Sequence, residues 1–302
     1  MQSKNTNQED STLVASACSK VAGFKELYNR LERKITISGK SQSTLNSYGR
    51  HIAHLALHFN CLPTELDQEQ IEDYLFYLKK EHSLSDSYFK FTVYGLRFLF
   101  RMEGLDERIV QLPELKRENK LPVVLSREEM KVLLKTPALL KHRILLALIY
   151  GCGLRCMEAR QMQIKDIDFD RGMVHIRQGK GRKDRYVPLG KLLSKGIKEY
   201  LSCEQPDKWL FNGKDHHEEF SQAAVQWVLR STVKKTGIKK DVTVHTLRHS
   251  YATHLLEDGL DIVSIKELLG HVRIETTMVY LHVASCGRQS AFSPLDSLYN
   301  LR

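Results

Sequence analysis

Residues 245–283 read HTLRHSYATHLLEDGLDIVSIKELLGHVRIETTMVYLHV, and this stretch decides how the second half of the chain is interpreted. Apolar residues recur with helical spacing from His245 to Gly259, which predicts a helix over these positions. Gly259 and Gly270 stand where helices are expected to end, because glycine readily takes the left-handed backbone conformation that closes a helix. The stretch is therefore predicted to consist of helices that end at glycine caps.

The sequence upstream of this stretch changes its periodicity. Met173–Arg177 and Arg185–Val187 have the composition of short strands and flank a Gly-Lys-Gly-Arg-Lys-Asp turn, which predicts a β-hairpin. Before the hairpin, Ser126 and Glu129 have the spacing of a capping box, in which two side chains satisfy free backbone donors at a helix start. Helical spacing returns after the hairpin. We therefore expect a mainly helical domain with one small β-sheet over residues 124–285.

The N-terminal part of the chain carries a wholly helical pattern. Apolar residues repeat every three or four positions in three stretches, and Pro63 and residues 83–87 interrupt them. The stretches contain Leu45, Tyr48, Ile52, Leu55 and Phe59, then Ile71, Tyr74, Leu75 and Leu78, then Leu84, Tyr88, Phe91, Tyr94 and Phe98. They predict a small all-α domain over residues 21–111.

Three less regular segments flank or separate these domains. Residues 1–20 are rich in Ser, Asn, Gln and Thr and are expected to form a flexible tail. Residues 112–123 hold charged residues between Pro113 and Pro122, which is typical of a linker. Residues 286–302 form a C-terminal tail whose apolar residues either a neighbouring protomer or the same chain could bury.

Composition narrows the class of protein. The 46 Lys and Arg exceed the 36 Asp and Glu, and the formal net charge of +10 favours polyanionic partners such as nucleic acid. The six cysteines are scattered, and only Cys152 and Cys156 lie close together, so a zinc site is not expected. The longest apolar run, Ile144–Tyr150, is far shorter than the roughly 20 residues that cross a bilayer. We expect a reduced, cytoplasmic protein without a membrane partner.

Five short segments combine residue types that suit chemistry on a phosphodiester. They are Gly153-Leu154-Arg155 with Glu158, Gly179-Lys180-Gly181, His245-Thr246-Leu247-Arg248, Leu269-Gly270-His271, and Tyr280. Taken singly, each has a more common structural explanation, since an arginine on a helix is usually solvated and a lysine in a turn is usually only a turn residue. The functional interpretation therefore depends on their order and spacing, with Tyr280 nine residues after His271.

In this order the segments resemble the catalytic motifs of the tyrosine recombinases, the family of phage integrases and Xer-type recombinases. Members of that family carry an arginine after a Gly-x-Gly-Leu turn, a lysine in a hairpin turn, a His-x-x-Arg that opens a helix, and a Leu-Gly-His before the nucleophilic tyrosine. The resemblance covers about residues 124–285. It implies a mixed α/β catalytic domain that follows a helical core-binding domain.

The resemblance implies catalytic roles for Arg155, Lys180, His245, Arg248, His271 and Tyr280. The residue types suit these roles. A phenol such as that of Tyr280 can form a phosphotyrosine link, which conserves the bond energy for rejoining. Arg155 and Arg248 can each present a planar fork to phosphate oxygens. His245 lies one turn before Arg248, where it can donate or accept a proton.

The remaining residues of the set have supporting roles. Lys180, or its neighbour Lys183, would protonate the departing 5′ oxygen, and by resemblance His271 supports the transition state. Glu158 is expected to orient the guanidinium of Arg155 and not to contact DNA. No metal and no cofactor are expected, because the arginines, the lysine and the histidines supply the positive charge that Mg²⁺ supplies elsewhere.

The family cuts DNA within a tetramer on two paired sites. The resemblance therefore implies double-stranded DNA with inverted-repeat half-sites as the partner, a homo-tetramer on that DNA, and a monomer or weak oligomer without it. A nucleoid-associated location in the cytoplasm is expected. Basic residues of the helical domain are candidates for phosphate contacts, which position a protein without reading bases. They are Arg50, Lys79, Lys80, Lys90, Arg97 and Arg101.

The leading hypothesis is a site-specific DNA recombinase that works through a 3′-phosphotyrosyl intermediate. A type IB topoisomerase is disfavoured by the Xer-like context of His-x-x-Arg and Leu-Gly-His, and a DNA-binding protein without catalysis by the presence of every expected catalytic residue. An integron integrase is disfavoured because the stretch from Lys180 to His245 is too short for the insertion of those enzymes. Integration, excision and resolution of a mobile element, a phage or a replicon all stay open.

Overall fold

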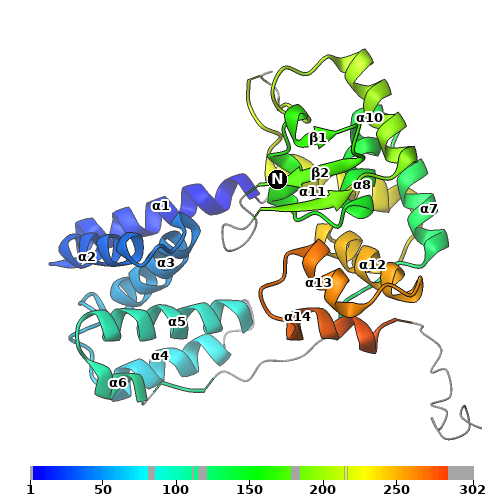
Figure 1. The fold of residues 1–302 in the computed structure, drawn as a ribbon. Helices are drawn as coiled ribbons and strands as arrows, with labels where there is room; N and C mark the ends of the chain where they lie inside the picture. Colours follow the sequence, from blue (N-terminus) through cyan, green and yellow to red (C-terminus); the bar gives the residue numbers. More distant parts are fainter. Residues whose placement is uncertain are drawn as a thin grey trace, which may run out of the picture. The chain divides into compact units, whose positions relative to one another are not determined.

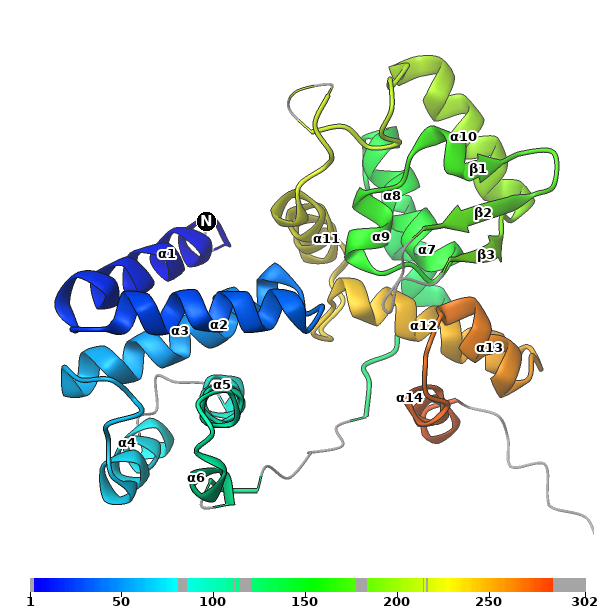
Figure 2. The same cartoon turned by 60° about the vertical axis from the view of Figure 1, so that its left-hand side comes forward.

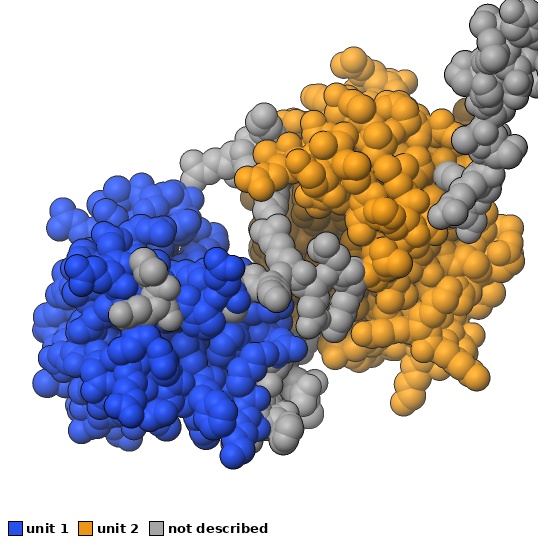
Figure 3. All heavy atoms as spheres, turned by 90° about the horizontal axis from the view of Figure 1, so that it is seen from below, with its two compact units in different colours: residues 1–118 blue, residues 119–302 orange. Residues whose placement is uncertain are grey.

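The computed structural model describes residues 3–80, 86–110, 112–114, 121–177, 184–213, 215 and 217–284. The chain divides into two compact units, residues 1–118 and 119–302, which are coloured separately in Figure 3. Each unit has a hydrophobic core of its own. None of the helices in the described residues is long and apolar enough to span a membrane.

Unit 1 is helical throughout its described residues (Figures 1 and 2). Its helices are α1 (Ser3–Lys20), α2 (Phe24–Ile37), α3 (Gln42–Phe59), α4 (Gln68–Lys80), α5 (Asp86–Met102) and α6 (Asp106–Val110). The predicted helical domain is therefore confirmed, with α3, α4 and α5 in place of the three periodic stretches. Ser41 begins α3, because its side chain accepts a hydrogen bond from the backbone of Thr44.

The structure differs from the sequence-based expectation at the N-terminus. Residues 3–20 form α1, whereas a flexible tail was predicted. Val14, Ala17, Cys18 and Val21 recur with helical spacing and pack into the core of unit 1, where α1 contacts α2 and α3. The burial of this narrow stripe stabilises a helix whose other residues are mostly polar.

The apolar face of α5 is also not the predicted one. Phe91 and Tyr94 are 45% and 38% exposed, whereas Val93, Leu96 and Leu99 are buried. Aromatic and aliphatic residues both recur with helical spacing along α5, so two faces of this helix are apolar. The aliphatic face packs into the core, and part of the predicted aromatic stripe faces outward.

Unit 2 combines helices with one small sheet (Figures 1 and 2). Its helices are α7 (Arg127–Lys135), α8 (Leu140–Gly151), α9 (Cys156–Arg160), η1 (Ile164–Asp166), α10 (Lys191–Glu204), α11 (Gln222–Thr236), α12 (Val244–Glu257), α13 (Ile262–Leu269), α14 (Glu275–Met278) and η2 (Val279–His282). The predicted capping box at the start of α7 is confirmed, because the Ser126 and Glu129 side chains each bond the other residue's backbone.

The sheet contains β1 (Ile167–Asp168), β2 (Met173–Ile176) and β3 (Arg185–Pro188), all antiparallel in the order β1-β2-β3. The predicted hairpin is confirmed as β2 and β3, with Val174 opposite Val187 and both side chains buried. The short strand β1 adds an edge that periodicity did not predict. The hairpin turn, residues 178–183, lies outside the described residues.

Helix α12 organises the part of unit 2 that carries the predicted motifs. It packs against α8, which lies far upstream in the sequence, and against α13 and η2, which follow it. The predicted glycine caps are confirmed: Gly270 closes α13 and Gly259 follows α12, both with positive φ. These caps turn the chain so that the segments after α12 and α13 return to it.

Candidate active site

Arg155 is placed by the tight connection between α8 and α9. Gly153 has a φ of 59°, which reverses the chain, and Arg155 then stands at the N-cap of α9. Its guanidinium donates to Glu158 Oε1 at 2.7 Å and to the carbonyl of Gly270 at 3.2 Å. The predicted contact between Arg155 and Glu158 is thus present, and the second bond ties Arg155 to the end of α13.

Glu158 is a buried carboxylate that contacts three arginines. Besides Arg155, it accepts two hydrogen bonds from Arg185, at 2.9 and 2.8 Å, and lies 3.7 Å from Arg248. Burial opposes its ionisation, but the bonds from Arg185 and the charge of Arg155 outweigh burial and lower the pKa of Glu158 to about 2. Glu158 is therefore a charged group that fixes the surrounding guanidinium groups.

Arg248 is almost fully buried at the start of α12. Its two terminal nitrogens donate to the carbonyls of Gly153 and Leu269, at 2.6 and 2.5 Å. Burial and the neighbouring charge of Arg155 lower the pKa of Arg248 to about 10, so it stays protonated at neutral pH. Each terminal nitrogen carries a second hydrogen, which can be offered to a phosphate oxygen.

His271 follows the glycine that ends α13. The backbone N–H groups of Gly270 and His271 donate to the carbonyls of Glu267 and Lys266, which closes the helix and aims the imidazole. Nδ1 of His271 lies 2.9 Å from the hydroxyl of Thr277. Burial and the nearby Arg248 and Arg155 lower the pKa of His271 to about 3, so the ring is neutral at pH 7.

Tyr280 lies on η2 and packs against α12 with its side chain 1% exposed. Its hydroxyl is 3.0 Å from Nδ1 of His249, one turn along α12 from His245. Burial raises the pKa of the Tyr280 phenol, whereas the charges of Arg248 and Arg155 act in the opposite direction. The His245 residue as a whole is exposed, but partial desolvation of its ring, together with the charge of Arg248, lowers its pKa.

These groups share one cavity of about 630 Å³. Among the residues that line it are Arg155, His245, Arg248, His249, Gly270, His271, Arg273, Thr276 and Tyr280. Among the residues that the structure describes, no carboxylate lines this cavity, although Glu158 pairs with Arg155 and lies close to Arg248. A concave site with three arginines, three histidines and no exposed acid favours an anionic ligand.

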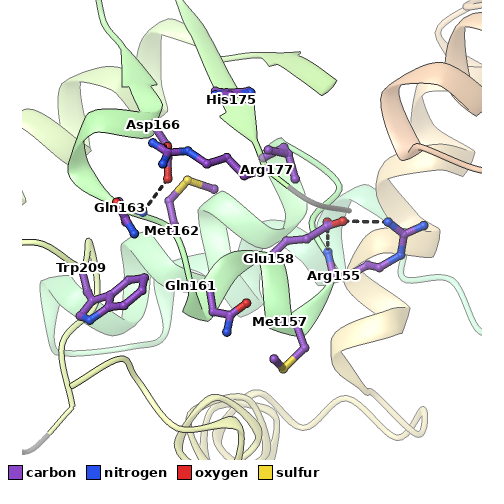
Figure 4. Close-up of a pocket in the computed structure, with 11 residues that line it drawn as sticks. Arg155, Met157, Glu158, Gln161, Met162, Gln163, Asp166, His175, Arg177 and Trp209 are labelled. Carbon is purple, nitrogen blue, oxygen red and sulfur yellow. Dashed lines mark hydrogen bonds and ion pairs between the residues drawn. The ribbon is translucent and has the colours of Figure 1, made fainter. Parts of the chain in front are cut away.

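Arg155 also lines a second cavity, of about 580 Å³, which Figure 4 shows. In this view the Arg155 and Glu158 side chains meet, and Asp166 and Arg177 form a second ion pair on another part of the lining. Trp209 contributes an aromatic wall. The charged groups that line this second cavity already have partners. The first cavity is therefore the candidate site for binding a phosphate.

Five of the six predicted catalytic residues thus converge within unit 2: Arg155, His245, Arg248, His271 and Tyr280. Lys180, and its alternative Lys183, lie outside the described residues. Sequence reasoning missed Arg185, His249 and Arg273. His249 could have been found, because it is four residues after His245 and so lies on the same helix face.

The predicted DNA-contacting residues lie on α3, α4 and α5 of unit 1. Lys79, Lys80 and Arg101 are exposed, whereas Arg50, Lys90 and Arg97 are half-buried. Several of them already have partners in the chain. Lys79 pairs with Asp86 at 2.7 Å, and Arg97 donates to the carbonyl of Pro113 at 2.8 Å.

Comparison with known proteins identifies the class that this fold and site define. The sequence model of the Phage integrase family matches residues 123–285, and that of the phage integrase N-terminal SAM-like domain matches residues 27–109. A putative integrase/recombinase of Sinorhizobium fredii is 35% identical over 90% of this chain and 89% of its own length. Tyrosine recombinase XerA of Thermococcus kodakarensis is 35% identical over 85% of this chain and 91% of its own length.

Solved structures agree at the level of the fold. The XerH recombinase in its post-cleavage complex with a palindromic difH substrate has a TM-score of 0.67 at 21% identity, over 97% of this chain and 94% of that one. A λ integrase fragment bound to a core site has a TM-score of 0.67 at 18% identity, over 83% and 96%. The chain belongs to the phage integrase family of tyrosine recombinases, enzymes that cleave and rejoin DNA.

Proposed function

We propose that the chain is a site-specific DNA recombinase in which Tyr280 attacks a backbone phosphate and forms a 3′-phosphotyrosyl intermediate. The observation that carries the proposal is the cavity that Tyr280 lines together with Arg155, Arg248 and three histidines, with no carboxylate among its described lining residues. Integration, excision and resolution are the reactions that this exchange of strands would serve.

The geometry supports a division of roles. Arg155 and Arg248 are held at fixed angles by backbone carbonyls and by Glu158, so they are positioned before DNA binds. Such preorganised cations stabilise the charge that develops on a phosphate in the transition state. The imidazole of His271, neutral at pH 7, can add a hydrogen bond to the same phosphate.

Lys180 completes the proposed set as the group that protonates the departing 5′ oxygen. It lies in the turn between β2 and β3, and β3 begins with Arg185, which bonds Glu158 directly. The contact between Arg185 and Glu158 therefore anchors β3 to the active site at the end that follows the segment with Lys180. Lys183 is the alternative donor in the same turn.

A covalent-trapping experiment tests the proposal. Duplexes that bind the chain are first selected from a random-sequence pool, and the selected site is then prepared with a nick beside the scissile phosphate, so that the cleaved strand is lost. We expect a protein–DNA adduct in the presence of EDTA. Tyr280→Phe removes the nucleophilic oxygen and should abolish the adduct while DNA binding persists, as measured by denaturing gels and mobility shifts.

Tyr200→Phe is the matched control, because Tyr200 is a fully buried tyrosine of α10 outside the cavity. This variant should form the adduct as the unmodified chain does. No adduct from the unmodified chain, or an adduct that survives in Tyr280→Phe, contradicts the mechanism. Relaxation of a plasmid that lacks the selected site would instead favour a type IB topoisomerase.

We also infer how the chain assembles. Double-stranded DNA with inverted repeats, about one helical turn per half-site, is the proposed partner, with a homo-tetramer on two paired sites. The C-terminal tail, residues 286–302, lies outside the described residues and is proposed to contact a neighbouring protomer. The nucleoid is the proposed location.

A further inference from the structure

Helix α12 carries two histidines on the face that borders the cavity, and they have different surroundings. The His245 side chain is exposed, while His249 lies one turn deeper with its ring centre 5.7 Å from that of Tyr280. Nδ1 of His249 is 3.0 Å from the phenolic oxygen, which is hydrogen-bonding distance. The residue that contacts the nucleophile is thus His249, which the family resemblance did not single out.

The charges around this hydrogen bond determine the protonation states of its two partners. Burial, together with His245 and Arg248 on the same helix, lowers the pKa of His249 to about 4, so its ring is neutral at pH 7. Arg155, Arg273 and His271 line the same cavity from other segments and add no negative charge. The phenol of Tyr280 keeps its proton because burial raises its pKa. We assign to His249 the tautomer that carries its proton on Nε2, in which Nδ1 accepts and the Tyr280 hydroxyl donates.

We propose that His249 takes the proton from Tyr280 as the phenolic oxygen attacks phosphorus, and returns it when the strand is rejoined. This role rests on the function proposed above. In the forward step the bond from the Tyr280 oxygen to phosphorus forms and the bond from phosphorus to the 5′ oxygen breaks. The phenolic proton moves to Nδ1 of His249, and the 5′ oxygen takes a proton from a separate acid, for which Lys180 is proposed.

The other imidazoles of the cavity are less suited to this step. Nδ1 of His271 is already within hydrogen-bonding distance of the Thr277 hydroxyl, at 2.9 Å. His245 lines the cavity, but among the described contacts its ring approaches His249, at 6.2 Å between centres, and not the phenol. Within the described residues, His249 is the imidazole that forms a hydrogen bond with Tyr280.

The test separates loss of the nucleophile's base from loss of the leaving group's acid. Single-turnover cleavage is measured on the selected DNA and on the same DNA with sulfur in place of the bridging 5′ oxygen. A thiolate leaves without protonation because it is a much weaker base than an alkoxide. We expect His249→Ala to slow cleavage on the order of 10²-fold on both substrates, the scale of general base catalysis. Lys180→Ala should be slow on the oxygen substrate only.

Three controls test whether the slower cleavage comes from loss of the His249 imidazole as a base. His282→Ala removes an exposed histidine from η2, next to Tyr280 in the fold but outside the cavity, and should cleave at the unmodified rate. Free imidazole should restore part of the activity of His249→Ala, in proportion to its unprotonated form. His249→Gln retains a polar side chain but no base, so it should be as slow as His249→Ala.

Specific outcomes would overturn this role. Cleavage by both His249 variants within about threefold of the unmodified rate would exclude a base whose contribution is at least 10²-fold. A defect that disappears on the sulfur substrate would place His249 at the leaving group. Failure of the unmodified chain to form any adduct is a separate result, because it contradicts the proposed recombinase function itself.

Discussion

At the scale of single residues, Glu158 is the charge on which the arrangement of the arginines depends. Its side chain is 6% exposed and pairs with Arg155 and Arg185, while Arg185 itself is only 9% exposed. Charges at this depth are stable only when they are paired. Removal of the carboxylate would leave buried guanidinium groups without a counter-charge next to the reacting phosphate.

We therefore predict that Glu158→Gln lowers the free energy of unfolding by about 3–5 kcal/mol, the range for a broken buried ion pair. Urea unfolding measures this loss. Glu103→Gln is the control, because Glu103 bonds Arg30 in a pair whose side chains are 22% and 54% exposed. That substitution should change stability by less than about 1 kcal/mol. Equal losses in the two variants would contradict the prediction.

The effect of Glu158 should depend on pH in a defined direction. The ordinary pKa of this carboxyl is 4.5, and in the folded chain it is lowered to about 2. The stabilisation is therefore complete above pH 4.5 and is lost as pH falls towards 2. The difference in unfolding free energy between the unmodified chain and Glu158→Gln should narrow over that interval.

The residues that sequence reasoning missed differ in what the sequence could have shown. Arg185 sits in a stretch that looks like an ordinary strand, and its function depends on Glu158, 27 positions away. A buried ion pair between such segments is visible only when the fold brings them together. His249 differs, because its helix position relative to His245 was readable, whereas its contact with Tyr280 depends on how η2 packs against α12.

At the scale of elements, the connection between α8 and α9 positions Arg155 through one glycine. Gly153 has a φ of 59°, and a Cβ at this position would lie 2.4 Å from the ring of Tyr251. Both the backbone conformation and the space around it exclude a side chain. Tyr251 belongs to α12, so the same contact sets the spacing between this connection and the helix that carries Arg248.

We predict that Gly153→Ala lowers the free energy of unfolding by about 2–4 kcal/mol, through backbone strain and overpacking together. The control is Gly237→Ala, because Gly237 has a φ of 72° and no atom within 4 Å of its added Cβ. It should lose only about 1 kcal/mol, the strain part alone. If chemical denaturation gives the two variants the same stability, the contact with Tyr251 is not limiting.

Elements with a clear local apolar pattern could be predicted from the sequence, whereas elements whose buried face depends on packing against other helices could not. Helices α3 and α4 have one apolar stripe, and the hairpin strands alternate around a turn, so local pattern sufficed for them. Helix α5 has two apolar faces, and only packing decides that Phe91 lies outward while Leu96 lies in the core. The polar composition of α1 concealed a stripe that other helices of unit 1 bury.

At the scale of the whole molecule, the chain is two folded units with separate cores and different chemistry. The predicted catalytic residues that the structure describes all lie in unit 2, while the predicted DNA-contacting residues lie in unit 1. Both units nevertheless contain buried histidines. Burial is the largest cause that lowers the pKa of His51 in unit 1 to about 4, and of His249 and His271 in unit 2 to about 4 and 3.

Because the pKa values of these histidines are lowered, we expect acid to reduce the free energy of unfolding of both units. Between pH 6.5 and these lowered pKa values, the unfolded chain binds protons that the folded chain does not. Stability therefore falls as pH decreases from 6.5 towards 4, and the fall ends where the folded histidines are also protonated. For His51 alone, a shift from 6.5 to about 4 corresponds to at most about 3 kcal/mol.

His51 gives the most direct test, because it is buried in the core of unit 1, whereas the predicted catalytic residues that the structure describes belong to unit 2. Its Nδ1 is 2.9 Å from the hydroxyl of Thr92, and its ring packs 4.2 Å from that of Tyr88. Arg50 and His54 nearby further disfavour its protonation.

In His51→Gln the proton-linked loss of stability is absent, so the free energy of unfolding of unit 1 should vary less between pH 6.5 and 4. Urea unfolding followed by circular dichroism measures that slope. His282→Gln, at an exposed position, should keep the slope of the unmodified chain. An unchanged slope in His51→Gln would mean that other groups set the acid sensitivity of unit 1.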